Sequence, residues 1–130
     1  MTATSPRPGS DGFFPEPMLY QPSGPPIPLL WAAHTPEEQR HYLDKLEVWV
    51  AWLIGHYRLD HRYVPECWAE HWELIEELSA LHLAWEGAYA TTSHADAPLT
   101  WHERLGHARP RLAEWVARTG CRAAEHRGRR

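Results

Sequence analysis

Apolar residues recur at steps of three and four through the middle of the 130-residue chain, which is the period of one face of an α-helix. Two such series predict two long helices, the first over about residues 36–58 and the second from near Pro65 to about residue 89. The first series comprises Tyr42, Leu46, Trp49, Val50, Leu53 and Tyr57, and the second Trp68, Trp72, Ile75, Leu78, Leu81, Trp85 and Tyr89. We expect these two faces to pack together as the core.

Residues with known preferences for helix ends support the first helix. Thr35 stands where an N-cap is expected, Pro36 occupies the first helical position, and Glu38 completes a capping box. Only the stretch LDHRYVP, residues 59–65, separates the two predicted helices. Because short connections join antiparallel neighbours, the two helices are predicted to form a hairpin.

The C-terminal third predicts shorter helices. The stretch TTSHADAPLT has the composition of a loop, and Thr100 with Glu103 offers a second capping box. Pro110 interrupts the pattern that follows, and Gly120 is suited to end it. No stretch alternates apolar and polar residues as a half-buried strand would. The predicted fold class is all-α, with a hairpin of two long helices plus one or two shorter C-terminal helices.

Proline divides the chain into regions. Eight of its twelve prolines lie in residues 1–30, where neither helical nor strand periodicity is found. We therefore expect a disordered, Pro-rich arm over residues 1–34, a helical domain over 35–122 and a basic flexible tail over 123–130. The aromatic residues Phe13, Phe14 and Trp31 of the arm could anchor it in a groove of a partner or of this chain, or the arm could simply fold back over the helices.

Charge is distributed unevenly around a formal net value of −4. The segment 66–86 is rich in glutamate and holds no Lys or Arg, whereas arginine dominates from residue 109 onward. Arginines neutralise phosphates without regard to sequence, so the C-terminal ones are candidates for nucleic-acid contact. These candidates are Arg109, Arg111, Arg118, Arg122 and Arg127. The glutamates are interpreted as a solvated helix face.

Two cysteines and two histidines have spacings that suit a metal site. Cys67 and His71 would share one face of the second helix, and Cys121 and His126 could complete a tetrahedral Cys2His2 set. The alternative interpretation is that Cys67 fills space in the core and His71 lies at the surface. Because the tryptophan and leucine stripe already supplies a core, we favour this alternative and expect no metal, cofactor or stoichiometric zinc.

No enzyme motif is complete. The stretch HERLGH places its second histidine five residues after the first, so the two rings diverge on a helix and cannot grip one ion. The single pair Glu38 and His41 lacks the second arm that a di-iron bundle needs. Neither a nucleophile elbow nor a phosphate-binding glycine loop is present. A non-enzymatic protein is predicted.

The apolar runs and the cysteine content indicate the cellular compartment in which we expect the protein. The longest apolar run, at residues 48–54, is far too short to span a bilayer. Two cysteines provide no disulfide framework. We expect a cytoplasmic protein that does not enter a membrane.

Several segments resemble a family of small actinobacterial proteins that is catalogued only as a domain of unknown function. Its members are often found on plasmids, phages and integrative conjugative elements. The resemblance covers roughly residues 46–121, and its most specific part is the run from Leu78 to Glu86. The matching residues are Trp49, Val50, His71, Glu73, Leu78, Ala80, Leu81, Ala84, Trp85, Glu86, His107, Pro110 and Cys121.

Departures from the family pattern concern its Cys and His positions. Pro65 stands where the family has a cysteine, with Cys67 displaced by two residues, and Arg109 and Arg111 replace an Asp and a His. If that pattern encodes a metal site, this chain has rearranged it. The resemblance implies an interaction module or accessory protein of a mobile genetic element, with a protein partner. The alternative is a metal-stabilised or DNA-associated accessory protein that uses the Arg-rich C-terminus.

Overall fold

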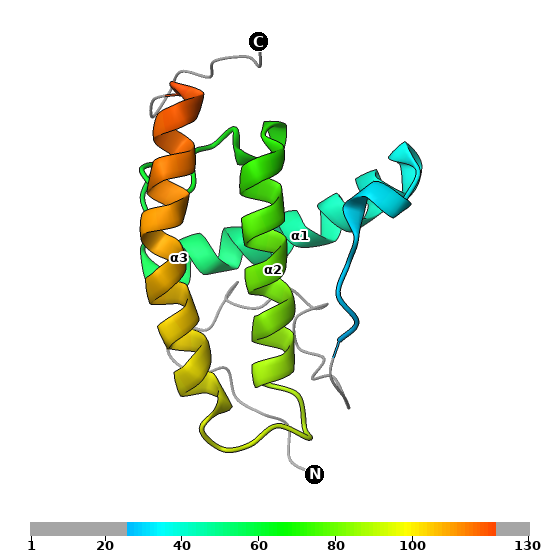
Figure 1. The fold of residues 1–130 in the computed structure, drawn as a ribbon, viewed down its shortest axis with the longest axis vertical. Helices are drawn as coiled ribbons and strands as arrows, with labels where there is room; N and C mark the ends of the chain where they lie inside the picture. Colours follow the sequence, from blue (N-terminus) through cyan, green and yellow to red (C-terminus); the bar gives the residue numbers. More distant parts are fainter. Residues whose placement is uncertain (1–25, 122–130) are drawn as a thin grey trace, which may run out of the picture.

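The computed structural model describes residues 26–121, and this part of the chain is helical and contains no strand. The all-α prediction is therefore confirmed. The elements, in chain order, are the 3-10 helix η2 (Trp31–Ala33), α1 (Pro36–Tyr57), the 3-10 helix η3 (Trp68–Glu70), α2 (Trp72–Ala88) and α3 (Ala97–Thr119). Figure 1 shows α2 and α3 side by side and antiparallel, with α1 crossing the pair.

The N-terminus of α1 has the predicted capping box. The side chain of Thr35 accepts a hydrogen bond from the backbone N–H of Glu38, and the Glu38 carboxylate accepts one from the backbone N–H of Thr35. Pro36 is the first residue of the helix. At the other end Arg58 adopts a left-handed conformation with φ 56°, which stops α1 one residue earlier than predicted.

The second helix begins later than its apolar pattern predicts. Instead of one helix from Pro65, the chain makes a 3-10 turn at Trp68–Glu70 and then an extended residue, His71, before α2 begins at Trp72. This break lets Trp68 and His71 both become buried, while Trp72 stays 40 % exposed. Tertiary packing has overridden the local helical period here, so the prediction that Trp72 lies in the core is wrong.

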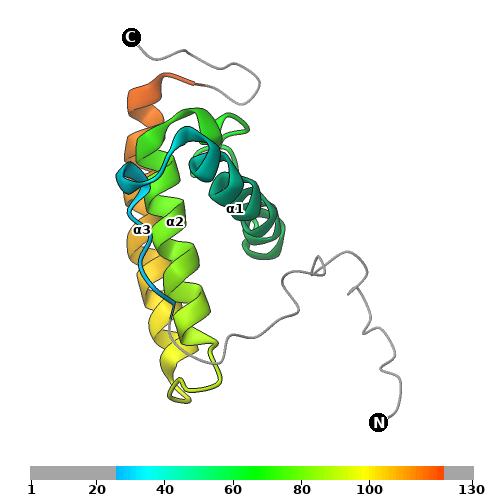
Figure 2. The ribbon, with the colours of Figure 1, turned by 90° about the vertical axis from the view of Figure 1, so that its right-hand side faces the viewer.

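The first two helices are in contact, as predicted, but they cross instead of forming an antiparallel hairpin. Because α2 begins late, the connection from α1 spans residues 58–71 and includes η3, which gives the chain room to turn. It is α2 and α3 that form the antiparallel pair; Figure 1 shows α1 running across them, and Figure 2 shows that it lies on one side of the pair. The short connection 89–96 between α2 and α3 explains why these two are neighbours.

A single long helix replaces the shorter C-terminal helices that were expected. α3 starts at Ala97, three residues before the proposed cap at Thr100, and continues through Pro110 to Thr119. Proline inside a helix leaves the carbonyl four residues earlier without its N–H partner. Both Pro110 and Gly106 are exposed, so water can bind that carbonyl and the helix is not forced to end. Gly120, with φ 77°, ends it as predicted.

Tryptophan dominates the core between the three helices. Trp49 and Trp101 are almost completely buried, and the indole N–H of Trp101 donates a 3.0 Å hydrogen bond to the carbonyl of Leu81. Trp31 is also buried, packed edge-on against Tyr42 and Trp72. The sequence places Trp31 in the flexible arm, but the structure makes it part of the helical domain. Phe13 and Phe14 lie outside the described residues.

None of the helices in residues 26–121 is long and apolar enough to cross a membrane.

Candidate metal centre

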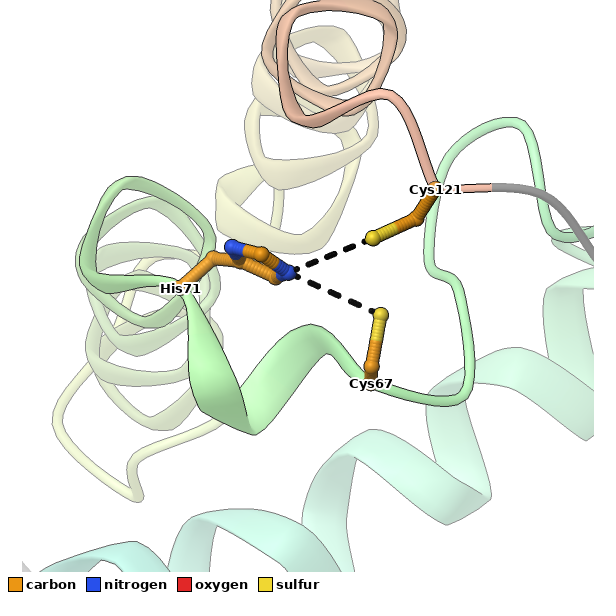
Figure 3. A group of neighbouring side chains, drawn as sticks. All are labelled: Cys67, His71 and Cys121. Atoms are coloured by element: carbon orange, nitrogen blue, oxygen red, sulfur yellow. Dashed lines mark hydrogen bonds between the residues drawn. The ribbon is translucent and has the colours of Figure 1, made fainter. Parts of the chain in front are cut away.

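Three of the four metal-ligand candidates come together at one end of the helix pair. Cys67 precedes η3, His71 is the residue before α2, and Cys121 follows Gly120 at the end of α3. Figure 3 shows the two cysteine side chains pointing toward the imidazole of His71 from two separate segments. The fourth candidate, His126, lies outside the described residues.

The distances among these atoms suit one bound ion. His71 Nε2 lies 3.6 Å from the Sγ of Cys67 and 3.5 Å from the Sγ of Cys121. All three potential ligand atoms lie within 4.8 Å of one another. In a tetrahedral site with zinc–sulfur and zinc–nitrogen bonds of ordinary length, the nitrogen–sulfur separation is about 3.6 Å. The two nitrogen–sulfur distances therefore match those of a tetrahedral zinc site.

Hydrogen bonding alone accounts less well for this arrangement. In its neutral form with Nδ1 protonated, an imidazole has one lone pair on Nε2, and that lone pair faces two thiols here. Thiols are also weak donors. A cation placed between the three atoms would interact with the nitrogen lone pair and with both sulfurs, so the geometry favours a metal over a shared hydrogen bond.

Burial affects the chemistry of the ligands. His71 is only 4 % exposed, whereas Cys67 and Cys121 are partly exposed. Burial, together with the hydrogen bond and proximity to Cys121, raises the pKa of Cys67 to about 11. Without a metal, Cys67 is therefore a thiol at neutral pH. A metal ion must displace its proton, because the thiolate is the form that binds metal.

The turn after α3 places Cys121 beside Cys67 and His71. Gly120 has a positive φ that a glycine adopts readily, and it turns the chain away from the axis of α3. The Thr119 hydroxyl donates to the carbonyl of Val116 and accepts from the backbone N–H of Cys121. This turn brings Cys121 beside His71, which is fifty residues earlier in the chain.

Three residues that the sequence offers as candidates are brought together, but the predicted local structure is wrong for two of them. Cys67 and His71 were expected one turn apart on a continuous helix, whereas Cys67 precedes a 3-10 turn and His71 is extended. His71 was expected at the surface and is instead buried. Gly120 is the residue in the sequence that indicates a turn before Cys121, but nothing in the sequence indicates the direction of that turn.

The nucleic-acid candidates do not gather on one face of α3. Arg111 forms a two-bonded ion pair with Glu77 on α2, and Arg118 pairs with Glu114 on its own helix. Arg109 lies over the ring of Tyr63 in the connection after α1, with its guanidinium carbon 5.0 Å from the ring centroid. Arg122 and Arg127 lie outside the described residues. Arg111 and Arg118, seven residues apart, share one face of α3, and Arg109 lies on the opposite face.

Three of the six glutamates of the acidic segment are exposed, as expected, and the other three are half-buried. Glu66, Glu70 and Glu76 are exposed, and the half-buried Glu77 and Glu86 pair with Arg111 and His82 respectively. Glu38 serves in the capping box, and His102 contacts the Tyr57 hydroxyl at 3.1 Å. These contacts give the polar residues structural partners.

Comparison of the chain with protein-family models, with curated proteins and with solved structures finds no match. Classification therefore rests on the geometry alone. The chain is a small helical protein with a Cys2His set of potential metal ligands.

Proposed function

We propose that this chain is a non-enzymatic helical interaction module in which a zinc ion, bound by Cys67, His71 and Cys121, fastens the end of α3 to the start of α2. The observation that carries the proposal is the convergence of three ligand atoms within 4.8 Å from two distant segments. The proposal differs from the interpretation that we favoured from the sequence, which was that no metal binds because the apolar stripe already supplies a core.

Zinc fits the donor set best among common metal ions. Two sulfurs and one imidazole nitrogen are soft to borderline ligands, which disfavours calcium and magnesium. Structural zinc sites use combinations of Cys and His with tetrahedral geometry. Copper(I) also binds such ligands, so the choice of zinc is part of what the experiment must test.

A fourth ligand would complete the tetrahedron, and we assign it to His126. Within residues 26–121 the cluster contains three ligand-bearing side chains. Residues 1–25 contain neither His nor Cys, and His126 is the only such residue in 122–130. It follows Cys121 by five positions, a spacing at which paired ligands commonly occur in structural zinc sites.

Two hollows formed by described residues lie away from the cluster. One hollow of about 250 Å³ lies between α1 and the start of α2, and another of about 330 Å³ lies between the end of α2 and the start of α3. Neither is lined by Cys67, His71 or Cys121. Neither of these two hollows could therefore serve a zinc ion at the cluster as a substrate pocket.

Location and biological context complete the proposal. A cytoplasmic location suits the site, because cytosolic reductants keep thiols available for zinc. The resemblance to proteins of plasmids, phages and conjugative elements supports an accessory role in such an element, through a protein partner. Capture of the tagged chain from a host carrying the element, with and without zinc, would test whether a partner depends on the metal.

The direct test is metal stoichiometry. Purified chain loaded with zinc and then dialysed should retain one zinc by elemental analysis. Loading with cobalt(II) should give thiolate-to-metal charge-transfer absorption and the intense visible bands of tetrahedral cobalt. Cys67→Ser, Cys121→Ser and His71→Ala should lose both signals, whereas His107→Ala, which changes an exposed histidine of α3, should keep them.

Two results would count against the proposal. Wild-type chain that retains no zinc under reducing conditions would refute it, and so would His107→Ala losing metal as fully as His71→Ala. His126→Ala tests the fourth ligand separately. Unchanged cobalt spectra in that variant would assign the fourth position to water or another donor, and would leave the three-residue site intact.

A further inference from the structure

We infer that the same centre responds to peroxide by exchanging its zinc for a disulfide between Cys67 and Cys121. This inference rests on the proposed zinc site and adds its regulation. The chain has only two cysteines, and both Sγ atoms lie in the cluster, at 3.6 and 3.5 Å from the same nitrogen.

The positions of the two sulfurs make an intramolecular bond accessible. They lie within 4.8 Å of each other with His71 beside both, and Figure 3 shows their side chains approaching from different segments. A disulfide requires the sulfurs to approach to about 2.05 Å. Cys121 lies just beyond the Gly120 turn at the end of α3, where the backbone is not held by a helical ladder, so it can supply this movement.

A small oxidant can reach both sulfur atoms from solvent. Both cysteines are partly exposed, whereas His71, the third ligand, is buried. Peroxide can therefore reach sulfur from solvent, while the imidazole holds the ion from the inner side. Zinc itself has no redox chemistry, so any electrons come from sulfur.

The reaction balances with hydrogen peroxide as the named oxidant. One zinc-bound thiolate attacks a peroxide oxygen, the O–O bond breaks, and a sulfenic acid forms as hydroxide leaves and takes up a proton. The second thiolate attacks the sulfenic sulfur, the S–S bond forms, and a second hydroxide leaves and is protonated. Two electrons pass from the sulfurs to peroxide, two waters are produced, and zinc leaves because the site has lost both thiolates and keeps only the imidazoles of His71 and the assigned His126.

The exchange keeps the chain cross-linked. Zinc and the disulfide both tie residue 67 to residue 121, so α3 stays fastened to the start of α2 in either state. What changes is that the metal charge is lost and the His71 imidazole is released. Oxidation should therefore alter the surface around the site without unfolding the helices.

The test uses full-length, zinc-loaded protein. Elemental analysis first establishes one zinc per chain, and hydrogen peroxide is then added in the presence of a chromogenic zinc chelator. We expect one equivalent of zinc to be released in step with a Cys67–Cys121 disulfide found by peptide mapping. The helical circular dichroism signal should be retained, and a dithiol reductant should restore zinc binding. His107→Ala is the matched control and should behave as wild type.

The outcomes separate the two proposals. A chain that holds no zinc before peroxide is added overturns the zinc site itself. Zinc that is bound but is retained after oxidation, or is released with sulfinic acid or intermolecular disulfide as the main product, overturns the switch and leaves the zinc site standing. Cys121→Ser provides a second measurement, because peroxide should then give no intramolecular disulfide, and formation of the same mapped cross-link in this variant would overturn the assignment of Cys121.

Discussion

Replacing Trp101 by alanine should destabilise the protein more than most other single changes in α3. The side chain is 1 % exposed, and its N–H donates to the carbonyl of Leu81 across the α2–α3 contact. Truncating a buried Trp to Ala costs about 3–5 kcal/mol, and a typical hydrogen bond contributes about 1 kcal/mol of such a loss. A domain of this size is stable by roughly 5–15 kcal/mol, so the variant should retain a folded but weakened state or lie near the limit of folding.

Thermal and urea denaturation followed by circular dichroism measure this loss. For a domain of about one hundred residues, a loss of about 4 kcal/mol should lower Tm by roughly 15–30 °C. Trp101→Phe keeps most of the buried ring and should cost only about 1–2 kcal/mol. Leu99→Ala is the matched control, because Leu99 lies in the same helix and is 66 % exposed, and it should change stability by less than about 0.5 kcal/mol.

Zinc should restore part of the stability that Trp101→Ala removes. An ion that binds only the folded chain stabilises it by about 2.7 kcal/mol when free zinc is 100 times its Kd. Trp101→Ala should therefore melt at a higher temperature with buffered zinc than with chelator. Equal costs for Trp101→Ala and Leu99→Ala would show that the assigned α2–α3 contact is wrong.

Three further predictions follow from individual contacts. Trp31→Ala should cost about 3–5 kcal/mol in urea denaturation because Trp31 is buried, whereas Leu30→Ala, at a 67 % exposed position, should be nearly neutral. Arg111→Ala should cost about 1–3 kcal/mol, measured the same way, because the side chain of its partner Glu77 is only 16 % exposed and would lose its ion pair. The metal-free chain should lose stability as pH rises from about 9 to about 11, since the raised pKa of Cys67 favours the folded state only while the thiol is protonated. Cys67→Ser should remove that part of the pH dependence in melts recorded with chelator.

The class of fold and the ends of two helices could be predicted because they depend on local physics. The capping box at Thr35 and the glycine stop at Gly120 need only neighbouring residues, and both are found in the structure. Helical periodicity identified Trp49 and Leu78 as buried for the same reason. Such features do not depend on which helix packs against which.

Predictions failed where long-range packing decides the local structure. Residues 65–71 continue the apolar period of α2, yet the chain breaks there so that Trp68 and His71 can both be buried. At Pro110 the error is the reverse, because a break was predicted and the helix continues. Pro110 lies on the outer face of α3, where water can replace the lost hydrogen bond. Neither outcome can be read from the neighbouring residues.

The convergence of Cys67, His71 and Cys121 could not be predicted because the predicted topology was wrong, although the residues themselves were candidates. At about 1.5 Å per residue, α2 is about 25 Å long and α3 about 34 Å. The two are antiparallel and joined by a short connection, so α3 returns past the start of α2 and ends beside residues 67–71. A helix stopped at Pro110 would have ended roughly 14 Å short, and a hairpin of α1 with α2 would have given Cys121 no defined neighbour. The continuous α3 is thus what brings Cys121 to His71, and a metal site of this kind becomes predictable from sequence only once the helix pairing is known.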